Sequence, residues 1–188
     1  MRNYFYTILL FLCTCSIAFG QTKEWITVKD TIAAYIIDFP AQAKKSSQDV
    51  PTEKGNVVMN SYTVQTLNDK NLIYMTSYTK YPDSFFPNGL NTVEEIQAVL
   101  DGSVAGAVKN TNGTLLSDTS IVFNGYQGRN FQIGIVDPAT KENYIIHMHA
   151  YMVDLSLYIT QVIYSEKDEA NDDAWRFFES FELINVKR

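Results

Sequence analysis

The stretch from Gly125 to Tyr164, GYQGRNFQIGIVDPATKENYIIHMHAYMVDLSLYITQVIY, is the part of the chain that decides the fold. It divides into three β-type runs separated by two turns. The first turn is Asp137-Pro138-Ala139-Thr140, with Pro at a favoured turn position, and the second is Val153-Asp154-Leu155. Because short turns join antiparallel neighbours, the stretch predicts three consecutive antiparallel strands. We expect the rest of the chain to pack against this ribbon.

Strand-like patterns continue outward from the ribbon. The expected strands are 23–29, 34–40, 56–67, 72–79 and 115–123. The segment 41–55 is polar, contains Pro51 and ends at a Lys54-Gly55 turn signal, so it predicts a loop.

Two segments have helical periodicity. Thr92 and Glu95 match a capping box, and apolar residues then recur at steps of three and four to about Val108. The second helix is expected over 165–180, with Ser165 as its cap. The order is four strands, a helix, four strands and a helix. It predicts an α+β protein, with helices packed on an antiparallel β-sheet.

Residues 1–20 have the layout of a secretory signal peptide. Arg2 supplies a positive charge, Tyr4 to Ala18 is an apolar run too short to span a bilayer, and Ala18-Phe19-Gly20 is a small-x-small cleavage site. We therefore predict cleavage after Gly20 and a secreted or periplasmic product that begins at Gln21.

A lipoprotein anchored through Cys13 or Cys15 is the less favoured alternative. Leu12 and Thr14 stand where lipoprotein processing requires a small residue. Cleavage after Gly20 removes both cysteines, which excludes disulfides, a cysteine nucleophile and thiolate metal sites from the mature chain. The 168 remaining residues, 21–188, are enough for one domain with its own hydrophobic core.

The mature chain is acidic. With Arg2 removed, 14 basic and 21 acidic side chains remain, a formal net charge of −7. Because nucleic acids and anionic membrane surfaces attract clusters of Lys and Arg, neither is an expected partner. No other apolar run approaches membrane-spanning length.

Several short motifs, spread over nearly the whole mature chain, resemble small secreted bacterial proteins of the PsbP/Mog1-like superfamily. They are Tyr35-Ile36-Ile37-Asp38-Phe39-Pro40, Ser77-Tyr78-Thr79-Lys80-Tyr81-Pro82, Gly125-Tyr126-Gln127-Gly128-Arg129, Tyr151-Met152-Val153-x4-Tyr158 and Phe177-Phe178-x2-Phe181-x-Leu183. The resemblance implies an α-β-α sandwich around an antiparallel sheet. The superfamily includes extrinsic photosystem subunits, a small-GTPase-binding protein and many secreted members of unknown role. The resemblance transfers no functional residue, and the signal peptide argues against a cytosolic GTPase partner.

The loop 81–89 is the first candidate site. It carries Tyr81, Phe85 and Phe86 together with Pro82 and Pro87, next to a helix N-terminus. Exposed aromatic side chains at this place would form a lip that binds a protein or a glycan. Alternatively, these rings plug the end of the sheet.

His147 and His149 are the second candidate. Two residues apart on a strand, they share a face, with Cα atoms roughly 6.5–7 Å apart, a spacing compatible with one metal ion. A zinc site needs further ligands, and Glu142 and Asp154, at the ends of the same strand, cannot supply them without distortion. Another strand would have to contribute an acid. The alternative is a pair of half-exposed sheet histidines.

Arg129 is the third candidate. It shares strand parity with Phe131, Ile133 and Ile135, so it is either an anion-binding residue in a cleft or a structural residue that ties its strand to a neighbouring loop.

No catalytic motif, complete metal site or cofactor signature occurs in the sequence. The leading hypothesis is therefore a non-enzymatic extracytoplasmic binding or accessory module, for an unknown protein or small ligand. A metal-dependent or otherwise cryptic enzyme centred on Arg129, His147 and His149 is the second, and a structural envelope component the third. The second hypothesis requires the three side chains to converge, together with an acid, in one pocket.

Overall fold

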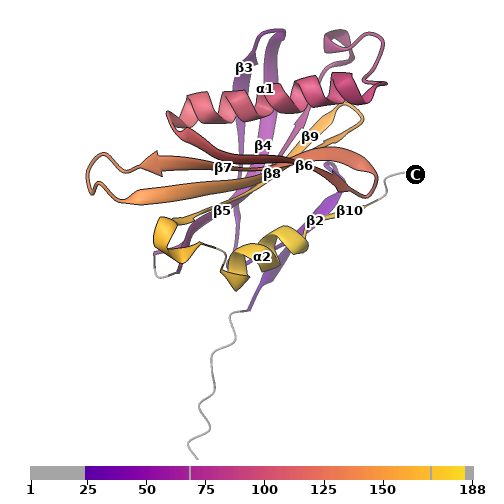
Figure 1. Ribbon diagram of the computed structural model, residues 1–188. Helices are drawn as coiled ribbons and strands as arrows, with labels where there is room; N and C mark the ends of the chain where they lie inside the picture. The colour runs from indigo at the N-terminus through magenta and orange to yellow at the C-terminus, as the bar shows by residue number, and fades with distance from the viewer. Residues whose placement is uncertain (1–23, 68, 170, 185–188) are drawn as a thin grey trace, which may run out of the picture.

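The computed structural model describes residues 24–67, 69–169 and 171–184 (Figure 1). The predicted signal peptide, with Cys13 and Cys15, lies outside the described residues. The elements are β1 (Ile26–Asp30), β2 (Tyr35–Phe39), β3 (Lys44–Thr52), β4 (Gly55–Gln65), β5 (Asn71–Lys80), the 3-10 helix η1 (Asp83–Phe85), α1 (Val93–Thr111), β6 (Thr114–Phe123), β7 (Tyr126–Val136), β8 (Asn143–Val153), β9 (Ser156–Ser165), the 3-10 helix η2 (Glu166–Asp168), α2 (Asp172–Glu179) and β10 (Glu182–Leu183).

Seven strands form one antiparallel sheet in the order β3-β4-β5-β9-β8-β7-β6. The predicted ribbon is confirmed as β7, β8 and β9, which pair in sequence order. The turn from β6 into the ribbon has Asn124 and Gly125 at φ values of 52° and 88°. Asn and Gly tolerate this left-handed conformation best, and it matches the twist of a two-residue hairpin.

The helix α1 covers one face of the sheet (Figure 1). It begins at the predicted capping box, in which Thr92 Oγ1 accepts the N–H of Glu95 and the Glu95 carboxylate accepts the N–H of Thr92. Its buried side chains join an apolar cluster with β7, β8 and β9. The cluster contains Leu100, Val104, Phe131, Ile133, Ile146, Met148, Ala150, Met152 and Leu157.

The opposite face is covered by α2 and a small sheet in the order β1-β2-β10. The core on this side is rich in aromatic residues. The ring of Phe177 on α2 lies 5.2 Å from that of Phe39 on β2 and 5.4 Å from that of Tyr74 on β5. One side chain therefore joins the helix, the small sheet and the large sheet.

The α+β class, with an antiparallel sheet and two helices, is as predicted. The second layer differs from the expectation, because β1 and β2 leave the main sheet and share that layer with α2. The sequence does not indicate this division, since β1 and β2 have the same alternating pattern as the other strands.

The segment 41–55 is not a loop but contains the edge strand β3, and this prediction was wrong. Eight of its nine residues are exposed and none is buried, so no alternation of apolar and polar residues marks it as a strand. Lys44, Lys45, Asp49 and Pro51 are typical of an edge strand that resists pairing with other chains.

The last helix is also shorter than the predicted 165–180. Ser165 ends β9 and makes no side-chain cap, η2 follows, and α2 begins after Asn171, whose side chain accepts the N–H of Ala174.

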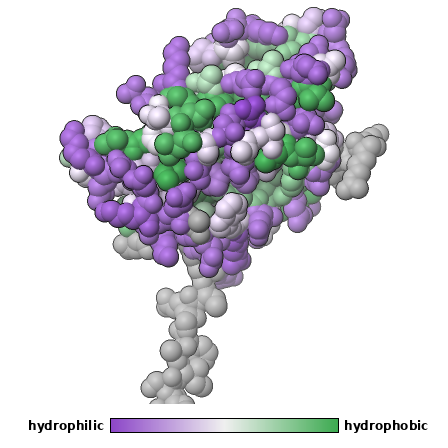
Figure 2. All heavy atoms as spheres, in the orientation of Figure 1, coloured by the Kyte–Doolittle hydropathy of each residue, from purple (hydrophilic) through white to green (hydrophobic). Residues whose placement is uncertain are grey.

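Among the described residues, no helix is long and apolar enough to cross a membrane. Figure 2 shows a largely hydrophilic surface with separate hydrophobic patches on the side of α1 and the sheet edge. The exposed apolar side chains of β6 are Leu115, Leu116 and Val122.

Candidate functional site

The loop between β5 and α1 divides its aromatic side chains between two roles. Tyr81 packs partly buried against the α1 core, and its N–H donates to Leu155 O at 2.8 Å. Burial raises the pKa of the Tyr81 hydroxyl. The rings of Phe85 and Phe86 lie 6.4 and 5.7 Å from that of Tyr81, and both residues line a hollow. Tyr81 therefore closes the end of the core, while Phe85 and Phe86 face a hollow.

The hollow, which we name the aromatic hollow, has a volume of about 460 Å³. Its main lining residues are Lys54, Phe85, Phe86, Pro87, Leu90 and Val99. Phe85 leans on the turn between β3 and β4, where a Cβ on Gly55 would lie 3.2 Å from its ring. The hollow thus depends on the hairpin that contains β3.

Lys54 is the cation of the aromatic hollow. Its Nζ donates to Phe85 O at 2.7 Å and lies 4.1 Å from the centre of the Phe86 ring, within cation–π range. Glu95 also borders the hollow, but its carboxylate is held by the N–H groups of Asn91 and Thr92, which lower its pKa. The aromatic hollow therefore also includes Lys54, Leu90 and Val99, which were not predicted from the sequence as site residues. In the sequence, Lys54 is marked only by a turn signal. Its contact with the loop depends on strand β3, which was not predicted.

His147 and His149 lie on the opposite face of the sheet and are not half-exposed: their residues are 5% and 9% exposed. His147 Nε2 lies 2.8 Å from Asn130 Oδ1, and its Nδ1 lies 3.4 Å from the Tyr164 hydroxyl. Because Asn130 Oδ1 can only accept, the neutral His147 ring carries its proton on Nε2. Burial lowers the pKa of His147 to about 4, so the ring is uncharged at neutral pH.

His149 is enclosed by other rings. It stacks on Phe178 with ring centres 4.2 Å apart, its Nδ1 lies 3.2 Å from the Tyr151 hydroxyl, and its Nε2 is buried without a hydrogen-bond partner among the described residues. Burial, with a smaller contribution from His147, lowers its pKa to about 3. Residues 24–67, 69–169 and 171–184 contain no group of three or more His, Cys, Asp or Glu side chains arranged to hold a metal ion.

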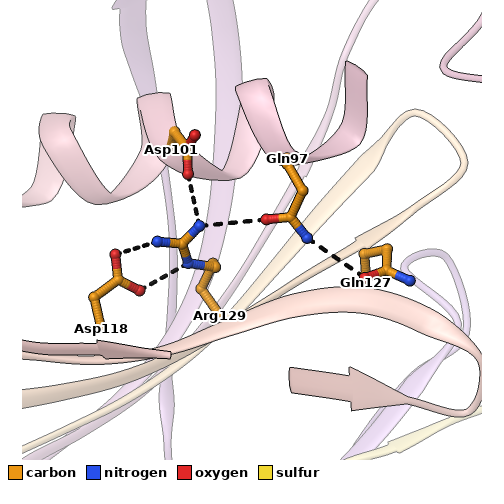
Figure 3. A network of polar contacts seen from close by, with 5 residues as sticks. All are labelled: Gln97, Asp101, Asp118, Gln127 and Arg129. Atoms are coloured by element: carbon orange, nitrogen blue, oxygen red, sulfur yellow. Dashed lines mark hydrogen bonds and ion pairs between the residues drawn. The ribbon is translucent and has the colours of Figure 1, made fainter. Parts of the chain in front are cut away.

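Arg129 points to the α1 side of the sheet (Figure 3). Its Nε donates to Asp118 Oδ1 at 2.7 Å, a second bond joins Nη2 to Asp118 Oδ2, and Nη1 donates to Asp101 Oδ1 at 2.7 Å. These carboxylates raise the pKa of the guanidinium, Asp118 most of all. Arg129 thus ties β7 to β6 and α1, as in the structural alternative, although its partners are a strand and a helix rather than a loop.

The three residues of the enzyme hypothesis therefore do not share a site. Arg129 pairs with Ala150 across the β7–β8 ladder, whereas His149 pairs with Asn130, the next residue along β7. Since successive side chains of a strand point to opposite faces, Arg129 and the histidines are separated by the sheet. The partners Asp101 and Asp118 were missed because they come from elements whose placement beside β7 follows only from the fold.

The fold of the chain is similar to that of a known protein. No protein-family model and no curated protein matches the chain. Among solved structures it is similar to cyanobacterial PsbP (CyanoP) from Synechocystis sp. PCC 6803, with a TM-score of 0.54 and 10% sequence identity over 89% of this chain and 97% of that one. This likeness shows a PsbP-like fold.

Two weaker likenesses are to a protein from Bacteroides thetaiotaomicron (TM-score 0.47, 8% identity, 84% of this chain and 47% of that one) and to a protein of unknown function from Pseudomonas aeruginosa (TM-score 0.39, 10% identity, 87% and 99%).

Proposed function

We propose that this protein is a non-catalytic, extracytoplasmic binding or accessory module that contacts a partner protein at the aromatic hollow. The observation that carries the proposal is the hollow itself: a concave, mostly apolar surface of about 460 Å³ with a lysine at its border. Protein interfaces centre on such surfaces, where aromatic and apolar anchors are surrounded by polar groups.

The PsbP-like fold agrees with an accessory role, since the superfamily that the sequence resembles includes extrinsic photosystem subunits. We also infer that the layers correspond to the α-β-α sandwich of the PsbP/Mog1-like superfamily. The opposed positions of α1 and α2 support this inference (Figure 1). The predicted signal peptide supports a location outside the cytoplasm.

The separation of Arg129 from the histidines speaks against the enzyme hypothesis. Burial lowers the pKa of His147 to about 4 and that of His149 to about 3, well below the pKa of a general base that works at neutral pH.

The test is photo-crosslinking in the native envelope, with the crosslinker placed at Leu90. A single crosslinked protein is expected, and Phe85→Ala/Phe86→Ala should remove it without lowering the melting temperature. The matched control is Leu67→Ala, an apolar truncation at an exposed turn, which should leave the crosslink intact.

A large fall in the melting temperature of Phe85→Ala/Phe86→Ala would instead identify these rings as a structural plug. If the protein fractionates with the envelope but gives no crosslink from the aromatic hollow, the result would favour the hypothesis of a structural envelope component.

A further inference from the structure

A second concavity lies on the opposite face of the sheet, between β6, β7 and α2. We name it the polar cleft; its volume is about 280 Å³. Hydrogen-bonding side chains from four neighbouring strands line it: Ser117 and Thr119 of β6, Asn130 and Gln132 of β7, His147 of β8 and Tyr164 of β9. It is independent of the aromatic hollow, with which it shares no lining residue.

The strand register explains why these residues meet. Gln132 pairs with Ser117 on one side and with His147 on the other, and Asn130 pairs with Thr119 in the adjacent row. Residues at alternate positions of adjoining strands share one face, so the polar side chains form a continuous patch. This patch interrupts a face that is otherwise rich in aromatic residues.

The polar cleft keeps hydrogen-bonding capacity that the protein does not use. Asn130 Oδ1 accepts from His147, but the Asn130 amide nitrogen has no partner among the described residues. Among the described residues, the side chain of Gln132 makes two long contacts, 3.4 Å to the Tyr164 hydroxyl and 3.5 Å to Ser117 Oγ. The Thr119 hydroxyl donates to Asn130 O at 3.2 Å and can still accept. The amides of Asn130 and Gln132 and the hydroxyl of Ser117 can therefore donate to and accept from a ligand, and Thr119 Oγ1 can accept from it.

The lining is almost uncharged. His147 is neutral at pH 7, and Glu169, which is exposed, is the only charged side chain among the described residues that line the cleft. Within the described part of the chain no Lys or Arg lines it, so the lining offers no counter-charge to a phosphate or carboxylate. A charged ligand would also lose hydration that uncharged side chains replace poorly. These properties favour a neutral ligand.

Trp175 of α2 forms one wall. Its side chain is 41% exposed although its ring packs edge-on against His147, with ring centres 5.8 Å apart. A half-exposed indole beside uncharged amides and hydroxyls offers an apolar surface next to hydrogen-bonding groups. A sugar ring has the matching pair of surfaces: a face of C–H groups and a rim of hydroxyls.

We infer that the polar cleft binds one ring of a neutral carbohydrate, with the C–H face of the ring on Trp175 and its hydroxyls on Asn130, Gln132, Ser117 and Thr119. The volume of about 280 Å³, just below the roughly 300–1,000 Å³ range of small-molecule sites, suits a single ring. The aromatic hollow plays no part in this binding.

The test is saturation-transfer NMR and calorimetry on the mature protein. The probes are D-glucose, D-galactose and N-acetyl-D-glucosamine as neutral pyranoses, with inorganic phosphate and acetate as anions. At least one pyranose should bind, and neither anion should. Trp175→Ala should weaken the pyranose about tenfold or more, and Trp175→Phe, which keeps a ring, should weaken it less.

Asn130→Ala should weaken binding as well, while Phe86→Ala in the aromatic hollow should leave it unchanged. Circular dichroism checks that each variant is folded. Binding of an anion in place of the pyranoses, no binding of any of the three pyranoses, or unchanged binding by folded Trp175→Ala would each overturn the inference. None of these results bears on the crosslinking outcome at Leu90.

Discussion

His147 and His149 are held neutral by their surroundings rather than by a charged partner. The unfolded chain binds a proton on each ring near pH 6.5, whereas the folded protein resists protonation down to about pH 4 and about pH 3. Between these values the unfolded state binds more protons, so acid favours unfolding. The contribution of the neutral rings to stability is complete above about pH 6.5 and is lost as the pH falls toward the folded pKa values.

The first prediction is that His149→Phe flattens the acid dependence of stability. Phenylalanine can stack on Phe178 as the histidine does, but it cannot be protonated. Between about pH 6.5 and about pH 4, the free energy of unfolding should fall less steeply than in the wild type, by up to about 1.4 kcal/mol per pH unit. Urea titrations across this range measure both slopes, and equal slopes would show that His149 does not titrate as described. Any offset at neutral pH from the lost contact with Tyr151 leaves the comparison of slopes intact.

The two acids that hold Arg129 differ in exposure, and the second prediction rests on this difference. Asp118 is 16% exposed and binds the guanidinium through two oxygens, whereas Asp101 is 61% exposed. Asp118→Ala should lower the free energy of unfolding by about 1–3 kcal/mol, because a largely buried arginine loses its main partner. Asp101→Ala should cost at most about 1 kcal/mol, since solvent replaces the contact. Chemical denaturation of both variants decides the order; a larger loss for Asp101→Ala would contradict it.

Among the helices and strands, those whose sequence signals lie within a few residues of one another were predicted correctly. The ribbon β7–β9 and the start of α1 were predictable because periodicity, turn residues and the Thr92–Glu95 capping box lie within a few residues of one another. β3 was not predictable, because a strand solvated on both faces leaves no alternating pattern. The aromatic loop was predictable as a candidate site, but the reach of Lys54 to it was not, since that contact requires the hairpin of β3 and β4.

The start of α2 was missed for a related reason: its cap is fixed by a distant residue. Asn171 and Asn71 exchange two amide hydrogen bonds, of 2.7 and 2.8 Å, and both residues are buried. The same Asn171 oxygen accepts the N–H of Ala174. The cap thus attaches the helix to β5, whereas Ser165, the cap expected from the sequence, makes no side-chain cap at all.

The third prediction separates the two roles of Asn171. Asn171→Ala removes the cap and leaves the Asn71 amide short of partners, so the free energy of unfolding should fall by roughly 2–4 kcal/mol. Asn171→Ser keeps a capping oxygen but not the amide exchange and should cost less. The control Ser165→Ala should change stability by no more than about 0.5 kcal/mol. Denaturant melts of the three variants test this order. If Ser165→Ala lowered the free energy of unfolding as much as Asn171→Ala, the result would support the longer helix predicted from the sequence, with Ser165 as its cap.

For the whole molecule, two cores of different composition share one sheet. The α1 core is largely aliphatic and the α2 core largely aromatic, and strands β8 and β9 contribute alternate residues to each. Side chains on one face therefore constrain the backbone that supports the other. We expect the two layers to unfold together in one cooperative transition.

The fourth prediction tests this coupling with probes on one face and a mutation on the other. Trp25 packs against the aromatic core and Trp175 lies on α2, so tryptophan fluorescence reports on the side opposite α1. Leu100→Ala truncates a fully buried side chain of the α1 core and should cost about 2–5 kcal/mol. If the sheet couples the layers, the fluorescence transition of Leu100→Ala must shift as far as its far-ultraviolet circular dichroism transition. Phe177→Ala, the counterpart on the α2 side, should again give coincident transitions. A fluorescence midpoint that stays at the wild-type value in Leu100→Ala would mean that the layers unfold independently, and that the two candidate sites lie on separately stable units.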